Sequence, residues 1–223
     1  MKRILVLNIV LLIIAISLNY VSAQGIGFKG GLNLANVSGD DIDDTELRYG
    51  FAIGGFLVMD LNGQFFLRPE IYYTSKGFAM SMEESESTGD YEISYSGESS
   101  ITLNYLEVPV LGVFAVTKNF NLFAGPYLDI FLNGKTTTES EGYYRYLLND
   151  EWITQDLSGS DSEDIKSDEI NTPGLGLLFG AEYVIGKFSF DVRYSMGLTN
   201  IPDEDDVEVK HQVIQFMIGY YLP

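Results

Sequence analysis

The stretch FSFDVRYSMGL (Phe188–Leu198) alternates without a break between large apolar residues and small or polar residues. A period of two places successive side chains on opposite faces of an extended chain, so the stretch predicts a β-strand with one apolar and one polar face. Seven further ranges show the same alternation with varying regularity: 25–35, 49–59, 64–76, 101–116, 120–132, 174–184 and 210–222. The sequence therefore predicts an all-β chain of eight strands.

The connections between these strands alternate in length. Short connections are predicted at 60–63, 117–119 and 185–187, and long connections at 36–48, 80–100, 133–172 and 199–209. Short turns at one end and long loops at the other are typical of an outer-membrane barrel. The predicted fold is an eight-stranded antiparallel up-and-down transmembrane β-barrel, with short periplasmic turns and long acidic extracellular loops.

The two faces of the predicted strands differ in size as well as polarity. The polar face contains many glycines, which suit a narrow barrel interior, whereas the other face is broad, aliphatic and aromatic. A soluble periplasmic ligand-binding barrel is the alternative, and it would point the apolar face inward around its ligand. The small polar face favours the membrane barrel, in which outer-membrane lipid covers the apolar face.

The N-terminus has the layout of a secretory signal peptide. Lys2 and Arg3 precede an apolar run over residues 4–16, and Val21-Ser22-Ala23 offers small residues to a signal peptidase. We therefore expect residues 1–23 to be a cleaved signal peptide and residues 24–223 to form the barrel domain in the outer membrane. The chain has no Cys, which excludes disulfides, zinc–cysteine sites and lipoprotein acylation.

The 223 residues include 32 acidic and 13 basic side chains, and the net charge is −19. Such a charge argues against nucleic-acid binding, because a phosphate backbone is bound by Lys and Arg. The four long connections contain 26 of the 32 acids, so the acidity is predicted to lie outside the membrane.

Charged residues also occur on the polar face of the strands. Because an unpaired charge is costly in a narrow, dry interior, we interpret them as a paired network that fills the barrel. The network residues are Lys29, Arg68, Glu70, Lys76, Glu107, Asp129, Glu182, Asp191 and Arg193. No open general pore is expected, and removal of one partner, as in Glu107→Ala, is predicted to destabilise the barrel by a few kcal/mol, about the size known for broken buried pairs.

Three segments resemble the outer membrane protein β-barrel domain family of the PorT-like, Bacteroidetes type. They are LNYLEVPVL (103–111), GPY (125–127) and RYSMGLTNI (193–201), and GFKGGLN (27–33) is similar to that family's first strand. The resemblance covers the mature chain and implies an eight-stranded outer-membrane barrel, usually without an assigned activity. The founding member is associated with protein secretion, but no motif here carries that role over. The terminal Tyr220-Tyr221-Leu222-Pro223 departs from the aromatic last residue common in such barrels.

A non-enzymatic envelope or partner-binding barrel is the favoured function, and an outer-leaflet hydrolase is the alternative. A hydrolase would use the single His, His211, with a nearby acid to activate a water. The acids closest to it in sequence are Asp203, Glu204, Asp205, Asp206 and Glu208. No nucleophile motif accompanies them, so no catalytic residue and no cofactor are predicted.

Two acidic runs are weak candidates for calcium, which prefers carboxylate oxygens. Their residues are Asp40, Asp41, Asp43 and Asp44 in the first run, and Asp203, Asp205 and Asp206 in the second. Neither run has the spacing of an EF-hand loop, so solvated loops are the simpler interpretation.

The longest connection contains two apolar, aromatic segments, 142–148 and 151–154, on either side of Asn149-Asp150. This pattern predicts a projecting β-hairpin. Tyr143, Tyr144, Tyr146 and Trp152 are the candidate partner-binding residues, because aromatic side chains often anchor interfaces. A protein partner at 133–172 is the hypothesis, either on these side chains or on an open strand edge; the alternative is that the aromatics only hold the hairpin together.

Overall fold

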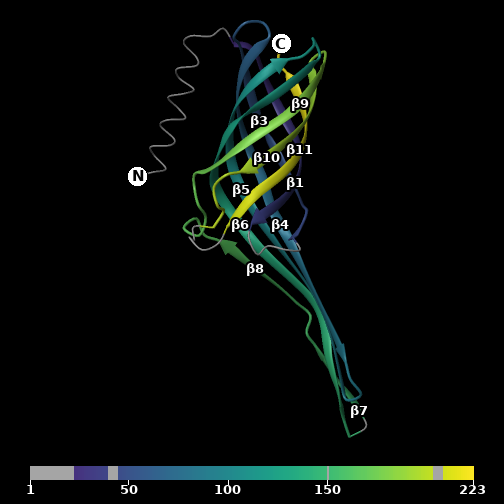
Figure 1. The fold of residues 1–223 in the computed structure, drawn as a ribbon. Coiled ribbons are helices and arrows are strands. Elements are labelled where there is room, and N and C mark those ends of the chain that lie inside the picture. The colour runs from purple at the N-terminus through teal and green to yellow at the C-terminus, as the bar shows by residue number, and fades with distance from the viewer. Residues whose placement is uncertain (1–22, 40–44, 150, 203–207) are drawn as a thin grey trace.

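A computed structural model describes residues 23–39, 45–149, 151–202 and 208–223 (Figure 1). Eight long strands close into a ring, which confirms the predicted fold class. They are β1 (Ala23–Gly39), β3 (Arg48–Asp60), β4 (Phe65–Ser87), β5 (Tyr91–Ala115), β6 (Phe120–Leu148), β9 (Gly174–Ile185), β10 (Phe188–Gly197) and β11 (Val209–Tyr221). Within the described ranges, no helix is long and apolar enough to cross a membrane.

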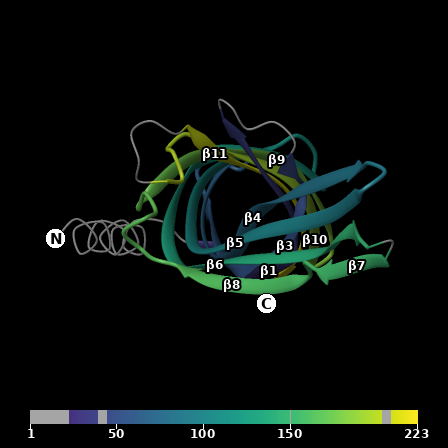
Figure 2. The same cartoon turned by 90° about the horizontal axis from the view of Figure 1, so that it is seen from below.

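Each strand of the ring pairs antiparallel with its neighbours in sequence, and β1 pairs with β11 to close it. The view along the barrel shows the strands wrapping around a common axis (Figure 2). Because every connection joins neighbouring strands, the topology is up-and-down. The C-terminus therefore lies at the end of the barrel where the tight turns are (Figure 1).

The turns use the residues that their geometry requires. Gly63 has a positive φ of 78° and its N–H donates to the Asp60 carboxylate at 2.5 Å. Asn62 accepts a hydrogen bond from the N–H of Phe65 at 2.8 Å, and Gly186 has a φ of 61°. Glycine adopts these left-handed conformations without a steric penalty, so the short connections close the hairpins as predicted.

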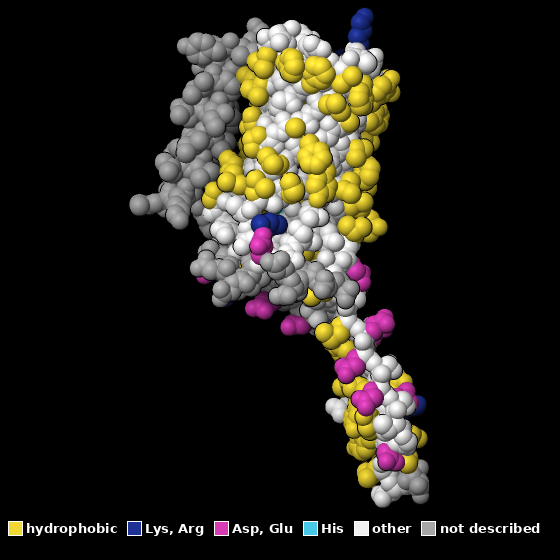
Figure 3. Space-filling view, in the orientation of Figure 1, with side chains coloured by type: hydrophobic (Ala, Val, Ile, Leu, Met, Phe, Trp, Pro, Cys, Tyr) yellow, Lys and Arg dark blue, Asp and Glu magenta, His cyan; other side chains and the backbone are white. Residues whose placement is uncertain are grey.

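The side chains alternate between the interior and the outer wall. The outer wall has exposed Phe188, Phe190 and Val192, and hydrophobic side chains are spread over the face of the barrel seen in Figure 3. The inner wall accommodates large side chains opposite glycines. A Cβ atom on Gly176 would lie 2.2 Å from the Tyr127 ring, so only glycine leaves room for that ring in the interior.

Two of the four predicted long connections are mainly strands: the strands beside 80–100 are longer than predicted, and 133–172 contains further strand in addition to the predicted hairpin. β4 continues to Ser87 and β5 begins at Tyr91, which turns most of 80–100 into a hairpin. β6 continues to Leu148 and pairs with β7 (Glu151–Asp156) and β8 (Gly159–Ile165). Alternation persists in these ranges, and β4, β5 and β6, with 23, 25 and 29 residues, are longer than the roughly 9–11 residues that a strand needs to cross a membrane.

These extensions form a sheet that projects from the barrel end opposite the C-terminus (Figure 1). We call it the arm; it comprises residues 81–100 and 134–165. Leu148 pairs with Glu151 at its tip, which confirms the predicted hairpin around Asn149-Asp150. A short strand, β2 (Thr45–Glu46), pairs with β4 at the base of the arm.

An apolar cluster fills the barrel end beside the arm. Its buried members are Val37, Leu103, Tyr105, Phe131, Ile170, Ile201 and Val209. Ile170 and Ile201 come from the connections rather than from the eight strands. The connections therefore cover this end of the interior with apolar side chains.

Candidate functional site

The structure places all nine predicted network residues inside the barrel, and each is at most 4% exposed. Six of them form a closed circuit in which cations and carboxylates alternate. In order around the circuit they are Lys29, Asp191, Arg193, Glu70, Arg68 and Glu182. We call this circuit the ionic ring; its three positive and three negative charges cancel.

Each member of the ionic ring contacts two members of opposite charge. Lys29 Nζ lies 2.7 Å from Glu182 and 2.5 Å from Asp191. Arg68 Nε lies 2.8 Å from Glu70, and its Nη1 lies 3.0 Å from Glu182. Complete pairing offsets the desolvation of six buried charges, which is the condition for tolerating them in a barrel interior.

Arg193 completes the ionic ring, with contacts of 2.8 Å to Glu70 and 2.8 Å to Asp191. Aromatic rings pack against its cations: Arg68 and Arg193 lie 4.7 and 5.3 Å from the centre of the Phe123 ring. The contributing strands, β1, β4, β9 and β10, span the barrel. Charged and aromatic side chains thus fill its cross-section at this level.

The other three network residues form a second group, which we call the lysine triad. Lys76 Nζ contacts Glu107 at 2.5 Å and Asp129 at 2.8 Å. The Tyr127 ring centre lies 4.8 Å from the same nitrogen. One cation thus pairs with two carboxylates, and Lys76 neutralises part of the negative charge of both.

His211 lies in the interior and is 5% exposed. Its Nε2 lies 3.1 Å from the Tyr105 hydroxyl, and the two rings meet edge to face. The acids at 203–206 lie outside the described residues, so no contact between them and His211 is stated. His211 also lines a small hollow together with Tyr105, Tyr127 and Asp129.

The calcium candidates Asp40, Asp41, Asp43, Asp44, Asp203, Asp205 and Asp206 all lie outside the described residues. In the part of the chain that is described, no three His, Asp or Glu side chains are grouped to hold a metal ion.

The arm has two chemically different faces. Side chains on its inner face, which continues the inner wall of the barrel, include Tyr91, Ile93, Tyr144, Tyr146 and Ile153. Tyr144 stacks on Tyr146 with ring centres 5.7 Å apart, and Tyr91 lies 6.4 Å from Tyr144. The inner wall is therefore ionic within the barrel and aromatic in the arm.

The outer face of the arm is polar, with one cluster around Arg145. Glu92 accepts hydrogen bonds from Arg145 Nε at 2.9 Å and from the Tyr143 hydroxyl. The Trp152 ring centre lies 5.2 Å from the Arg145 guanidinium. The four predicted partner-binding aromatics are thus divided, with Tyr143 and Trp152 on the outer face and Tyr144 and Tyr146 on the inner face.

The contacts of Glu92 make the stability of the arm depend on pH. The hydrogen bond from Tyr143, followed by that from Arg145, lowers the pKa of Glu92 below its ordinary value of 4.5. A lowered pKa in the folded arm means that the contact stabilises it above pH 4.5 and is lost as the pH falls through the lowered pKa. We expect fluorescence of Trp152, the single Trp, to change in this acid range.

A matched pair of variants separates this effect from general acid sensitivity. Glu92→Gln removes the titrating group and should abolish the fluorescence transition. Glu98→Gln alters another acid on the same strand and face and should preserve it. An unchanged transition in Glu92→Gln would assign the titration to other groups.

The range 80–100 was predicted to be a loop, so Tyr91, Ile93 and Tyr95 were not predicted to form part of a sheet surface. Their signal was present, since apolar residues occupy alternate positions 91, 93 and 95. The contribution of Ile170 and Ile201 to the apolar cluster was not predicted either, because isolated apolar residues in polar connections show no periodicity.

Comparisons with known proteins agree with this architecture. The family model described as outer membrane protein beta-barrel domain matches residues 22–203, most of the chain. Among curated proteins, none matches the chain.

Several solved structures are similar at low sequence identity. Ail of Yersinia pestis is 14% identical, with a TM-score of 0.42 over 90% of this chain and 100% of its own. Neisserial surface protein A is 15% identical, with a TM-score of 0.43 over 89% and 98%. CarO of Acinetobacter baumannii is 10% identical, with a TM-score of 0.39 over 90% and 98%. From the extent of the family match, the chain belongs to the outer membrane protein beta-barrel domain family.

Proposed function

We propose that this outer-membrane barrel is a non-enzymatic surface protein that binds an extracellular protein partner on the inner face of its arm. The observation that carries the proposal is the aromatic inner face, which no other described segment covers. Outer-membrane barrels place long connections outside the cell, so the arm would meet extracellular partners.

The inner face of the arm has no covering layer, because the strands on the opposite side of the ring do not continue into the arm. Within the membrane, strands on the opposite side of the ring close over the inner wall. Beyond it, β10 ends at Gly197 and β11 begins at Val209, so only β4 to β8 extend into the arm. A sheet gains most of its stability by packing an apolar face against another layer, and the arm is a single layer.

The charges around the inner face indicate the chemistry of the partner. Glu84 and Glu86 border the aromatic centre on β4, and Glu151 borders it on β7. The arm sequence contains 14 acids and two bases. An apolar patch with Lys or Arg around it complements an aromatic centre with an acidic rim, whereas a second copy of this chain would be repelled.

The packing of the barrel interior supports a function without catalysis and without transport. His211 is buried against Tyr105, and the ionic ring and the lysine triad occupy the barrel at two levels. We therefore propose no hydrolase activity and no general pore. The PorT-like, Bacteroidetes subtype and a role in secretion are not part of the proposal.

Shortening the arm tests this function. Met82, Gly97, Ser140 and Gly159 lie in one row of paired residues. Replacing 83–96 and 141–158 each by Asn-Gly would close two hairpins at this row. The shortened protein should lose binding of a Lys-flanked peptide with an apolar centre, because the aromatic face is gone.

The barrel itself should be unaffected, and an unboiled sample should still migrate faster than a boiled one on a detergent gel. A Glu-flanked version of the peptide is the control and should bind neither protein. Equal binding of the Lys-flanked peptide to both proteins would contradict the proposal.

A further inference from the structure

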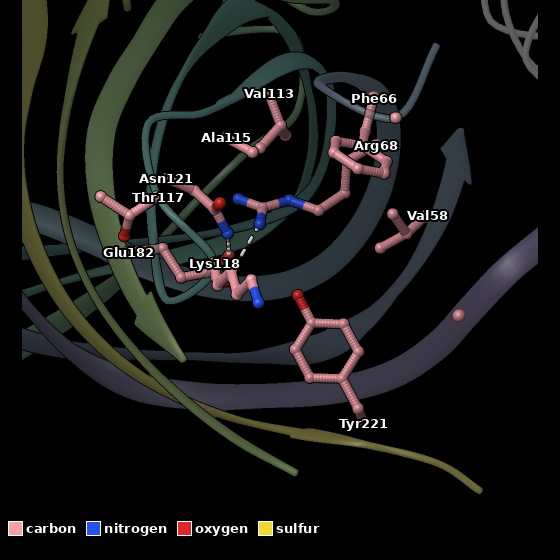
Figure 4. Close-up of a pocket in the computed structure, with 12 residues that line it drawn as sticks. Val58, Phe66, Arg68, Val113, Ala115, Thr117, Lys118, Asn121, Glu182 and Tyr221 are labelled. Atoms are coloured by element: carbon pink, nitrogen blue, oxygen red, sulfur yellow. Dashed lines mark hydrogen bonds and ion pairs between the residues drawn. The ribbon is translucent and has the colours of Figure 1, made fainter. Parts of the chain in front are cut away.

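The end of the barrel opposite the arm contains a hollow of about 390 Å³ (Figure 4). Arg68 and Glu182 of the ionic ring line it, together with the apolar side chains of Val58, Phe66 and Val113. The hollow lies at the end with the tight turns, which outer-membrane barrels direct to the periplasm. It is separate from the arm and plays no part in the proposed function.

Arg68 has hydrogen-bonding capacity left over at this hollow. Its Nε and Nη1 contact Glu70 and Glu182, and the remaining nitrogen, Nη2, has no carboxylate partner and no hydrogen bond of normal geometry. The hydroxyl of Tyr221 points toward the same guanidinium (Figure 4). A guanidinium has five N–H donors, and Glu70, Glu182 and the Tyr221 hydroxyl account for at most three of them, so Nη2 keeps an N–H for a further acceptor.

Lys118 adds a positive charge to the hollow, whereas the charges of the ionic ring cancel. It lies in the tight turn between β5 and β6, lines the hollow, and forms no ion pair with another described residue. Because the ionic ring is neutral, Lys118 leaves the hollow with one positive charge in excess. A single negative charge would balance it.

We propose that the hollow binds the carboxylate of a small periplasmic molecule with an apolar side chain, such as the C-terminal residue of a peptide. The carboxylate accepts hydrogen bonds from Arg68 Nη2 and Lys118 Nζ, and the side chain packs against Val58, Phe66 and Val113. A singly charged carboxylate fits better than a phosphate dianion, whose second charge would lie beside Glu182 without a partner.

The test uses N-acetyl-leucine, which has one carboxylate and one apolar side chain, with the full barrel in detergent micelles. Binding is followed by NMR of valine methyl groups. We expect saturable shifts at Val58 and Val113 and none at Val192, which is on the outer wall. N-acetyl-leucinamide, which lacks the charge, should give no saturable shift, and inorganic phosphate should bind at least about tenfold more weakly.

Two lysine variants provide the matched comparison. Lys118→Gln should weaken binding of N-acetyl-leucine by about tenfold, because a charge-assisted hydrogen bond is lost. Lys187→Gln changes a lysine in the turn between β9 and β10 that does not line the hollow, and should leave binding unchanged. The proposal is overturned by absent binding, by equal binding of the amide or phosphate, or by equal effects of the two variants.

Discussion

Replacing Lys76 by Met should lower the free energy of unfolding of the barrel by about 3–5 kcal/mol, the range found when a buried ion pair loses one partner. Lys76 is fully buried and is the cation that contacts both Glu107 and Asp129. Without it, two carboxylates face each other in the interior. Urea unfolding of the refolded protein in micelles, followed by gel mobility without boiling, measures the change.

Glu107→Gln is the comparison that makes this prediction specific. The sequence alone predicted that loss of Glu107 would leave a cation unpaired. In the structure Lys76 keeps Asp129 at 2.8 Å, so the triad becomes one cation with one carboxylate. We expect a loss of less than about 2 kcal/mol, similar to that of a single buried hydrogen bond. Equal losses in both variants would contradict the role of Lys76 as the cation shared by Glu107 and Asp129.

The second large effect concerns binding on the arm. The double variant Tyr144→Ser, Tyr146→Ser should weaken binding of the Lys-flanked peptide by at least about 100-fold, because stacked aromatics at the centre of an interface typically contribute most of its affinity. Titration of the peptide against the refolded protein, with a fluorophore on the peptide, gives the affinity.

A double variant on the opposite face serves as the matched control. Tyr143→Ser, Trp152→Ser also removes two aromatic side chains from β6 and β7 but leaves the inner face intact. Its affinity should stay within about threefold of the original protein, an effect of the size usual for a surface change. If this control loses binding and the inner-face variant does not, the binding surface is the outer face.

The inner charges could be predicted because period two assigns each strand residue to a face whatever the neighbouring strand does. Lys29 and Arg193 therefore share the polar face, which is the inner face in a membrane barrel whose apolar face contacts lipid. The pairing of Lys29 with Glu182 and Asp191 was not predictable, since it depends on the stagger of β1 against β9 and β10 around the ring.

The arm was harder to predict because membrane thickness does not limit strand length outside the membrane. Ser94 and Ser96 resemble loop residues in composition, yet they occupy the outer face of a strand whose inner face has Ile93 and Tyr95. The hairpin at Asn149 could be predicted because aromatic residues flank it on both sides. Tyr143 and Tyr144 lie on opposite faces of the arm, because successive residues of a strand alternate between its two faces.

Cysteine labelling at two adjacent positions of the arm tests the central claim most directly. The chain has no Cys, so Ile93→Cys on the inner face and Ser94→Cys on the outer face each introduce one reactive site. Intact cells are treated with a membrane-impermeant maleimide, with and without the Lys-flanked peptide. We predict labelling at both positions without peptide, and protection by peptide at Ile93→Cys alone. Failure to label Ile93→Cys on intact cells, or equal protection of both positions, would contradict an exposed inner face that binds the partner.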